Sequence, residues 1–557
     1  TLFAPGLVAF SRDAVAAAGS LVAAGVVFAL VSRRSFSPVT LVLGGLVVSL
    51  YCGAAATLLT LLNDRYLASL FIWGAGSLSQ QDWTIPLSLV PKLLVLSLAA
   101  ILLVRPLAVL SVGDDSARAL GASPATFRAL TVAVAVGLAA IVTSAVGVIG
   151  FIGLAAPALA RLTGARTVGS QIVWSTLIGS LLLFLTDNTI QLLAGSLSDF
   201  IPTGAVTALF GSPLLLLLLR KTKSLQVPGA QPAAVTRWSL PMSVTLTLGI
   251  LFPFLLLIGS IAFGRTGAGA WHLIFSSSAF DLLWELRAPR VVSAAAAGVM
   301  LAVAGVILQR LSGNDMASPE VLGVSSGAML GLAFGVFFLA SNQTGPLVVW
   351  AAVGAFAIMG LILLMARKSG FQAERMVLAG IAFTALLDAL IGALAATGDL
   401  RSLLLLRWMS GSTYGATDQS SLLLAGISLV LFAVCLVLVR WVDILDLGPQ
   451  VSGALGVPVK RARGVLFCLA GLMTAAATLS VGPLSFIGLM APHIARQLGF
   501  TRAGGQILVS ASAGASLMIV ADWIGRNGYF PYEMPAGLIS ALVGTPFLML
   551  LLSRQAE

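Results

Sequence analysis

The sequence FIGLAAPALARLTG at residues 151–164 occurs a second time, with nine of fourteen positions unchanged, as FIGLMAPHIARQLG at residues 486–499. The two copies lie 335 positions apart. The same spacing pairs Ala119-Leu120-Gly121 with Ala454-Leu455-Gly456. A single register that holds over roughly 170 residues indicates an internal repeat, which predicts two structurally equivalent halves.

Both halves consist mostly of long apolar runs. The chain is 59% hydrophobic and 9% charged, against about 25% charged residues in soluble domains, so it cannot cover itself with a polar surface. Runs of about 20 apolar residues cross the hydrocarbon layer as helices, whereas the strands of a membrane barrel alternate apolar and polar residues. The sequence therefore predicts an all-α polytopic membrane protein surrounded by the lipid bilayer.

The repeat also predicts how the chain is divided. We expect a first half at residues 1–220, a basic linker at 221–241 and a second half at 242–557. The apolar runs of the second half indicate an even number of spans, about ten, so two tandem, parallel, pseudo-symmetric ten-helix halves are expected. At the repeat spacing Thr1 pairs with residue 336, so we expect the first half to lack about two N-terminal helices, leaving about 18 spans.

The net charge of +11 is distributed in short basic clusters between the apolar runs. Nucleic-acid binding is therefore not expected. Most of the 31 lysines and arginines fall on one side of the predicted membrane topology, together with the linker and the C-terminus. Basic loops face the cytoplasm in most membrane proteins, so we expect a cytoplasmic C-terminus.

The repeated FIGL stretch contains a proline in an apolar run too short to span the bilayer. Such a run predicts a half-helix or re-entrant segment, which survives only where protein or a water-filled cavity lines it. A packing kink and a wall of a transport pathway are both compatible with this pattern. The candidate residues for the pathway are Gly153, Pro157, Gly488, Pro492 and the repeat-paired Trp73 and Trp408.

A loop of matched length, at residues 111–124 and 446–458, ends in Ala-Leu-Gly in both halves. The loop is amphipathic, and a plain connection would not need to keep its length. We expect two short helices, one per half, that dock a two-fold soluble partner. The residues expected to contribute are Ser111, Gly113, Ala119, Leu120, Gly121, Asp446, Gly448, Ala454, Leu455 and Gly456.

Three aspartates, Asp187, Asp388 and Asp522, lie inside apolar runs, where ionisable residues are costly and usually functional or paired. Arg526 follows Asp522 by four positions and is expected to pair with it on a helix. The repeat places Gln191 where the second half has Arg526. A proton relay through these aspartates remains an alternative function.

Two further arginines, Arg287 and Arg290, precede a span next to Trp284. Their spacing suits a receptor for carboxylates and equally suits an anchor at the membrane interface. No spacing of His, Cys, Asp or Glu indicates a metal site, and His493 falls on Ala158 in the other copy. We expect neither a bound metal nor a catalytic centre.

Several of these stretches together resemble the permease family of ATP-binding-cassette importers for iron-siderophores and cobalamin. They are the FIGLxxPHxxR-like repeat, Ala-Leu-Gly in the matched loops, NDMASPE at 314–320 followed by LGVSSGA at 322–328, and RAPR at 287–290. The double length is similar to the fused iron(III)-hydroxamate (ferrichrome-type) members of that family. The resemblance covers nearly the whole chain.

The resemblance implies a transport subunit of the bacterial inner membrane, not an enzyme. It implies that the matched loops are coupling helices seated on two copies of a cytoplasmic ATPase. It also implies that Arg287, Arg290 and Arg526 receive acidic residues of a periplasmic siderophore-binding protein. Because no GxxxxGK[ST] phosphate loop occurs in the sequence, we expect ATP and Mg²⁺ on the partner ATPase and no cofactor in this chain. The alternative is an ion-coupled secondary transporter that uses the intramembrane aspartates.

Overall fold

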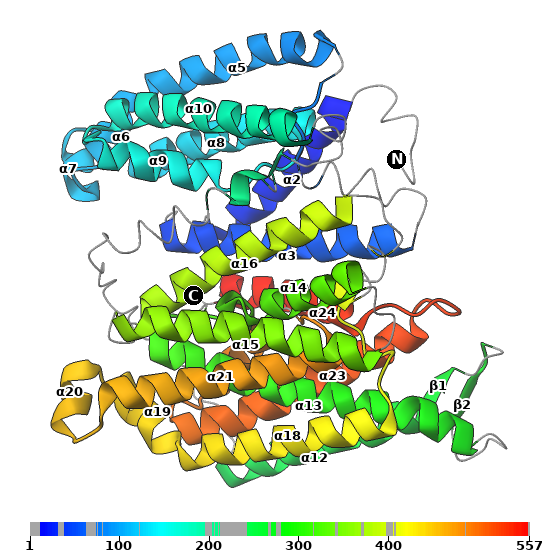
Figure 1. Ribbon diagram of the computed structural model, residues 1–557. Helices are drawn as coiled ribbons and strands as arrows, with labels where there is room; N and C mark the ends of the chain where they lie inside the picture. Colours follow the sequence, from blue (N-terminus) through cyan, green and yellow to red (C-terminus); the bar gives the residue numbers. More distant parts are fainter. Residues whose placement is uncertain are drawn as a thin grey trace.

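The structure is a computed structural model of the chain (Figure 1). It describes residues 12–31, 38–62, 82–121, 123–194, 242–265, 269–273, 280–315, 317–339, 344–368, 373–396, 408–484 and 486–554, together with 74, 76–80, 203–204, 206–209, 211, 401 and 405. The proposed linker at 221–241 and the candidate pathway residue Trp73 lie outside these described residues.

The first half consists of helices. They are α2 (Arg12–Val31), α3 (Pro38–Leu61), α5 (Thr84–Leu102), α6 (Val104–Leu110), α7 (Asp114–Ala119), α8 (Pro124–Val146), α9 (Ile152–Leu162) and α10 (Val168–Ala194).

The second half adds one short hairpin to its helices. Its elements are α12 (Met242–Ala262), β1 (Phe263–Arg265), β2 (Trp271–Leu273), α13 (Phe280–Ser312), the 3₁₀ turn η5 (Pro319–Leu322), α14 (Val324–Phe338), α15 (Thr344–Lys368), α16 (Ala373–Ala396), α18 (Asp418–Val437), α19 (Val439–Asp446), α20 (Pro449–Ala454), α21 (Val459–Val481), α22 (Ile487–Gln497), α23 (Ala503–Asn527) and α24 (Ala536–Arg554).

The helix bounds reproduce the repeat. Helices α7, α8 and α9 begin and end 335 positions before α20, α21 and α22. The backbone repeats as well, because Phe151 (φ 66°) and Phe486 (φ 77°) share a positive φ that non-glycine residues rarely adopt. The predicted fold class, an all-helical membrane protein of two tandem equivalent halves, is confirmed.

Eight helices among the described residues are long and apolar enough to cross a membrane. They are 84–102, 124–146, 168–192, 284–312, 345–367, 418–437, 459–481 and 503–527. In Figure 1 the long helices lie roughly side by side, with α7 and α20 at the left-hand end and the hairpin at the right-hand end. We refer to these as the loop end and the hairpin end.

Helix α13 is the centre of the second half. Its middle is buried from Val291 to Leu308 apart from a few partly covered positions. Two glycines permit this packing: a Cβ on Gly298 would lie 2.3 Å from the carbonyl oxygen of Gly514 on α23, and one on Gly305 would lie 1.9 Å from that of Gly488 on α22. Backbone therefore packs directly on backbone, as small residues allow in membrane helices.

The glycines spaced four apart on α14 make the same kind of contact. A Cβ on Gly331 would lie 2.0 Å from the carbonyl oxygen of Trp350, and one on Gly327 would lie 2.8 Å from that of Gly354 on α15. This contact is what the spacing of the glycines predicts.

The two halves meet along α3. Val47 and Ala54 of α3 are buried in one cluster with Met490 of α22 and with Leu538 and Ala541 of α24. A helix of the first half thus packs against the broken-helix region of the second.

The hairpin is an element that the sequence analysis did not predict. Strands β1 and β2 are three residues each and pair antiparallel, with Gly264 opposite His272. Phe263 and Trp271 stack with centroids 5.0 Å apart, and the Trp523 indole N–H donates to the carbonyl of Phe263 at 2.9 Å. Strands this short carry too little period-2 pattern to be recognised in sequence.

Candidate coupling and docking surfaces

The matched loops fold as predicted into two short helices at the loop end. Helices α7 and α20 each follow a glycine of positive φ, Gly113 (132°) and Gly448 (92°), and each is closed by another, Gly121 (78°) or Gly456 (80°). A side chain at these φ values is strained, which explains why glycine stands at all four positions.

Each short helix has one buried and one exposed face. Ala117 and its repeat partner Ser452 are fully buried, and the Ser452 hydroxyl lies 2.7 Å from the carbonyl oxygen of Ile444. On the other face Leu120 is 74% exposed and Leu455 is 58% exposed. The exposed leucine at the C-terminal end of each short helix leaves an apolar side chain accessible in both loops.

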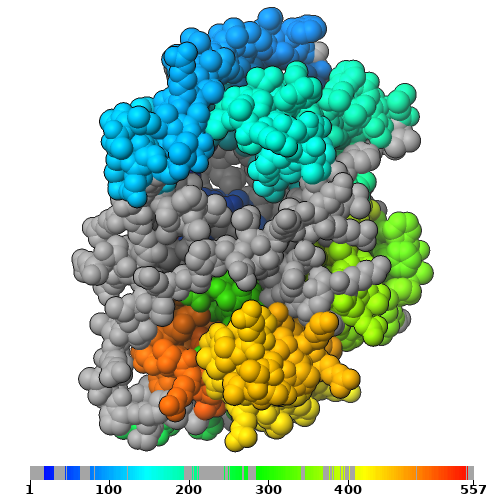
Figure 2. Space-filling model, turned by 90° about the vertical axis from the view of Figure 1, so that its left-hand side faces the viewer, coloured from blue at the N-terminus to red at the C-terminus, as the bar shows by residue number. Residues whose placement is uncertain are grey.

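The remaining loop candidates lie where the sequence placed them. Ser111, Gly113, Ala119, Gly121, Asp446, Ala454 and Gly456 are exposed, and Gly448 is half-buried. Figure 2 views the loop end directly and shows the surface around α6 and α7, in blue, and that around α18 to α21, in yellow and orange, both reaching this face. The structure therefore brings both loops to one end of the molecule.

The repeated proline stretches form the predicted short helices. Helix α8 is followed by Gly147 (φ 76°) and helix α21 by Gly482 (φ 81°), and these glycines separate the two helices from α9 and α22. The helices α9 and α22 have eleven residues each. Among the pathway candidates, Gly488 and Pro492 are buried, Pro157 and Trp408 are half-buried, and Gly153 is exposed. That these residues line a pathway stays a prediction.

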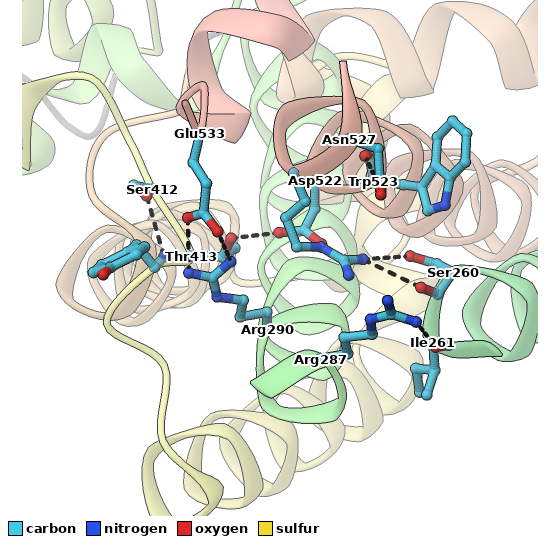
Figure 3. A network of polar contacts seen from close by, with 12 residues as sticks. Ser260, Ile261, Arg287, Arg290, Ser412, Thr413, Asp522, Trp523, Asn527 and Glu533 are labelled. Carbon is cyan, nitrogen blue, oxygen red and sulfur yellow. Dashed lines mark hydrogen bonds and ion pairs between the residues drawn. The ribbon is translucent and has the colours of Figure 1, made fainter. Parts of the chain in front are cut away.

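At the hairpin end, three predicted arginines lie in one polar network (Figure 3). Arg290 makes a two-pronged ion pair with Glu533, with both N–O distances at 3.0 Å. The Arg290 guanidinium also lies over the ring of Tyr414, 4.7 Å from its centroid. This bidentate geometry adds both strength and directional specificity to the arginine–carboxylate pair.

The predicted pair one helical turn apart is present. The Arg526 Nε donates to Oδ2 of Asp522 at 2.8 Å, and the Asp522 residue is only 1% exposed. The Thr413 hydroxyl donates to the other carboxylate oxygen, and Arg526 also donates to the Ser260 hydroxyl at 2.8 Å. Asp522 is thus fully committed to neighbouring side chains.

Arg287 is the third member of the network and is 5% exposed. Its guanidinium donates to the backbone carbonyls of Ile261 at 3.1 Å and Arg265 at 3.0 Å. The two carboxylates of this network each pair with one arginine, Glu533 with Arg290 and Asp522 with Arg526, whereas Arg287 donates to backbone carbonyls. That the three arginines receive acidic groups of a partner stays a prediction.

The aspartates of the alternative function lie on three helices. Asp187 on α10 accepts from the uncharged side-chain amide of Gln191 at 2.8 Å, at the repeat positions of the Asp522–Arg526 contact. Asp388 lies on α16. Within the described part of the chain, no group of three His, Cys, Asp or Glu side chains could hold a metal ion.

Sequence reasoning missed Glu533, the partner of Arg290, which lies 243 positions away. The signal available was a lone acid in the short turn between α23 and α24, seven positions after Arg526. Ser260 gave no signal, because one serine at the end of an apolar run is unremarkable.

A duplicated bundle of membrane helices, with a matched pair of exposed loop helices at one end and an arginine network at the other, defines a double-length membrane transport protein. The chain belongs to the FecCD transport family, whose model matches residues 1–221 and 247–554.

The relatives include proteins of the same double length. The chain is 41% identical over 553 residues to the iron(3+)-hydroxamate import system permease protein FhuB of Salmonella typhimurium, covering 99% of this chain and 80% of that protein. It is 41% identical over 558 residues to FhuB of Escherichia coli, covering 99% and 83%. The hemin transport system permease protein HmuU of Yersinia pestis is 34% identical over 328 residues, covering 56% of this chain and 96% of HmuU.

One solved structure shares the fold of about half of this chain. A metal-chelate type ABC transporter in an inward-facing conformation aligns with a TM-score of 0.50 and 24% identity, covering 56% of this chain and 99% of that chain.

Proposed function

We propose that this chain is the permease subunit of an ATP-binding-cassette importer that carries iron(III)-hydroxamate siderophores across the bacterial inner membrane. The proposal is supported by 41% identity to FhuB over nearly the whole chain. It is also supported by the matched pair of loop helices, because a duplicated docking element calls for a duplicated partner. Each chain would enclose the passage by itself, with residues 1–220 and 242–557 as its two walls.

The loop end is the cytoplasmic side in this proposal. The predicted topology puts most of the basic residues between spans on this side, together with the C-terminus that follows α24. By the positive-inside rule, the more basic side is cytoplasmic. Here α7 and α20 act as coupling helices, and residues 111–124 and 446–458 are called the first and second coupling loops. Their exposed Leu120 and Leu455 insert into two copies of a soluble ATPase, which binds ATP and Mg²⁺.

The hairpin end faces the periplasm and receives the siderophore-binding protein. Arg287, Arg290 and Arg526 supply the positive charge that attracts its acidic residues. Arg290 already forms an ion pair with Glu533, and the Glu533 side chain is 42% exposed. Docking through Arg290 therefore requires an incoming carboxylate to displace Glu533 or to join it.

The observation that carries the proposal is the repeat of α7 in α20 at one exposed end of the molecule. Co-purification tests it directly. We expect the chain to retain two copies of the ATPase per polypeptide and to transport ferrichrome only with ATP and the loaded binding protein. Uptake driven by a proton gradient in liposomes that contain neither partner would instead establish the ion-coupled alternative.

A variant test separates the coupling loops from the rest of the fold. A Cβ added at Gly121 or Gly456 meets nothing within 4 Å, but both residues have positive φ, so a larger residue strains the exposed loop locally and leaves the helix packing intact. We expect Gly121→Leu with Gly456→Leu to reduce ferrichrome uptake strongly, while the thermal unfolding temperature falls only by the few degrees that this local backbone strain of about 1–2 kcal/mol per site costs. Unchanged uptake in the double variant would remove the coupling assignment.

A further inference from the structure

Arg310, at the C-terminal end of α13, binds several separate segments at once. Its Nε donates to Oε1 of Gln506 at 2.7 Å, and its Nη1 lies 3.2 Å from Oδ2 of Asp446 and 3.4 Å from Oδ1 of Asp443. Its Nη2 donates to the carbonyl of Thr501. The Arg310 side chain is 8% exposed. One guanidinium therefore joins α13 to α19, to α23 and to the turn before α23.

The two acids that bind Arg310 connect it to α23 and to the second coupling loop. Oδ1 of Asp443 also accepts the backbone N–H of Ala503, the first residue of α23, at 2.7 Å. Asp446, the last residue of α19, is the first residue of the second coupling loop. Because a guanidinium is a rigid, planar fork of donors, it fixes the relative position of groups that it binds together.

The first coupling loop is attached differently. Ala108 and Ser111 stand at the repeat positions of Asp443 and Asp446. The Ser111 hydroxyl donates to the carbonyl of Ala108 at 2.7 Å, a contact with the last turn of the preceding helix α6. In α7, Arg118 forms an ion pair with Asp115 at 3.5 Å, and this pair lies within the helix. The acid pair around an arginine is thus a feature of the second loop.

Helix α13 continues from Arg310 to the docking network. Arg290 lies twenty positions earlier on the same helix, which corresponds to about 30 Å at 1.5 Å per residue. Between the two arginines, Gly298 and Gly305 hold α13 in backbone contact with α23 and α22. The second coupling loop is therefore bonded to the helix that carries Arg290.

We propose that Arg310 is a positioning residue that ties the second coupling loop to α13 and α23, so that movement of α20 reaches the hairpin end through a continuous helix. The inference rests on the proposed function, because it gives the ATPase-driven loop a defined attachment. Arg310 itself contacts neither ATP nor the siderophore.

The test uses the full chain with its ATPase and binding protein in liposomes, with ferrichrome as the probe. Arg310→Gln is expected to leave assembly and basal ATP hydrolysis in place and to lower the iron transported per ATP at least about fivefold, the usual lower bound for coupling between sites. Arg310→Lys keeps the charge without the fork and should give an intermediate ratio. The control is Arg367→Gln, which removes an exposed arginine at the same end of the bundle and should keep the wild-type ratio.

An assembled Arg310→Gln complex with the wild-type ratio of iron to ATP would overturn the inference. If this variant does not assemble, the milder pair Arg310→Lys and Asp446→Asn decides the matter. Because both substitutions act on the same contact, the double variant should transport no less iron per ATP than the poorer single variant. Independent, additive losses would overturn the inference. A wild-type chain that does not retain the ATPase defeats the proposed function instead, before any variant is measured.

Discussion

Helices α9 and α22 have the same length, the same proline and the same left-handed residue before them, yet their surroundings differ. In α22 the residues from Ile487 to Pro492 are buried, whereas α9 exposes Gly153 and Leu154. The difference lies in what covers them: Gly488 packs against Leu301 of α13 and Pro319 of η5.

This comparison separates two sources of structure. The backbone of a broken helix is set locally, because positive φ at Phe151 and Phe486 recurs whatever surrounds them. Burial is set by long-range packing, which the repeat does not determine. Predictions that change the same position in both halves therefore test how far the two environments differ.

The largest difference is expected between Asp522 and Asp187. Removing one partner of a buried ion pair costs about 3–5 kcal/mol, because the other charge is left uncompensated. Asp522→Asn should therefore destabilise the protein by about that amount, while Asp187→Asn, whose partner is the neutral Gln191, should cost about 0.5 kcal/mol or less. Thermal unfolding in detergent measures both; equal losses would break the comparison.

The next difference is expected at the paired glycines. A Cβ on Gly488 would lie 2.2 Å from Cδ of Pro319, whereas one on Gly153 meets nothing within 4 Å. Gly488→Ala should cost about 3 kcal/mol through overpacking, and Gly153→Ala should be neutral. The same unfolding assay applies. A large loss at Gly153 would show that a further helix covers α9.

A pH effect is expected beside the second broken helix, where Glu320 lies. Burial raises the pKa of Glu320 in η5 to about 7, although hydrogen bonds from the Ser318 side chain and the Phe486 backbone oppose the shift. The native state then keeps a proton that the unfolded state loses near pH 4.5. Stability from this group is complete below about pH 4.5 and declines by on the order of 3 kcal/mol as the pH rises to 7.

Glu320→Gln removes that titration. Its unfolding temperature should therefore depend less on pH between 4.5 and 7 than that of the wild type, with the gain in stability greatest above pH 7. A variant with the wild-type slope would show that Glu320 is ionised in the folded protein throughout this range.

The smallest expected effect is at the docking network. Glu533→Gln weakens the internal partner of Arg290 and should increase the affinity for the binding protein a few fold, equivalent to about 1 kcal/mol. Glu285→Gln removes an exposed acid from the same end of α13 and serves as the matched control. Titration calorimetry measures both, and a weaker Glu533→Gln complex would mean that Glu533 itself contacts the binding protein.

Sequence predicted whatever is local or periodic. The two short loop helices, the short helices that contain Pro157 and Pro492, and the Asp522–Arg526 turn all follow from spacing along one segment. The Arg290–Glu533 pair and the cluster around Arg310 join segments 133 to 243 positions apart. No periodicity links such positions, so only the packed chain reveals which acid each arginine meets.

The seam formed by α3 has a consequence for how the two halves can evolve. A symmetric pair of separate subunits must present one surface that fits itself, so each substitution appears on both sides at once. Here Val47 and Ala54 meet Met490, Leu538 and Ala541, and the gene can alter either face alone. Because the two halves are fused into one polypeptide, their interface does not need to be self-complementary, and each half can change its own surface independently.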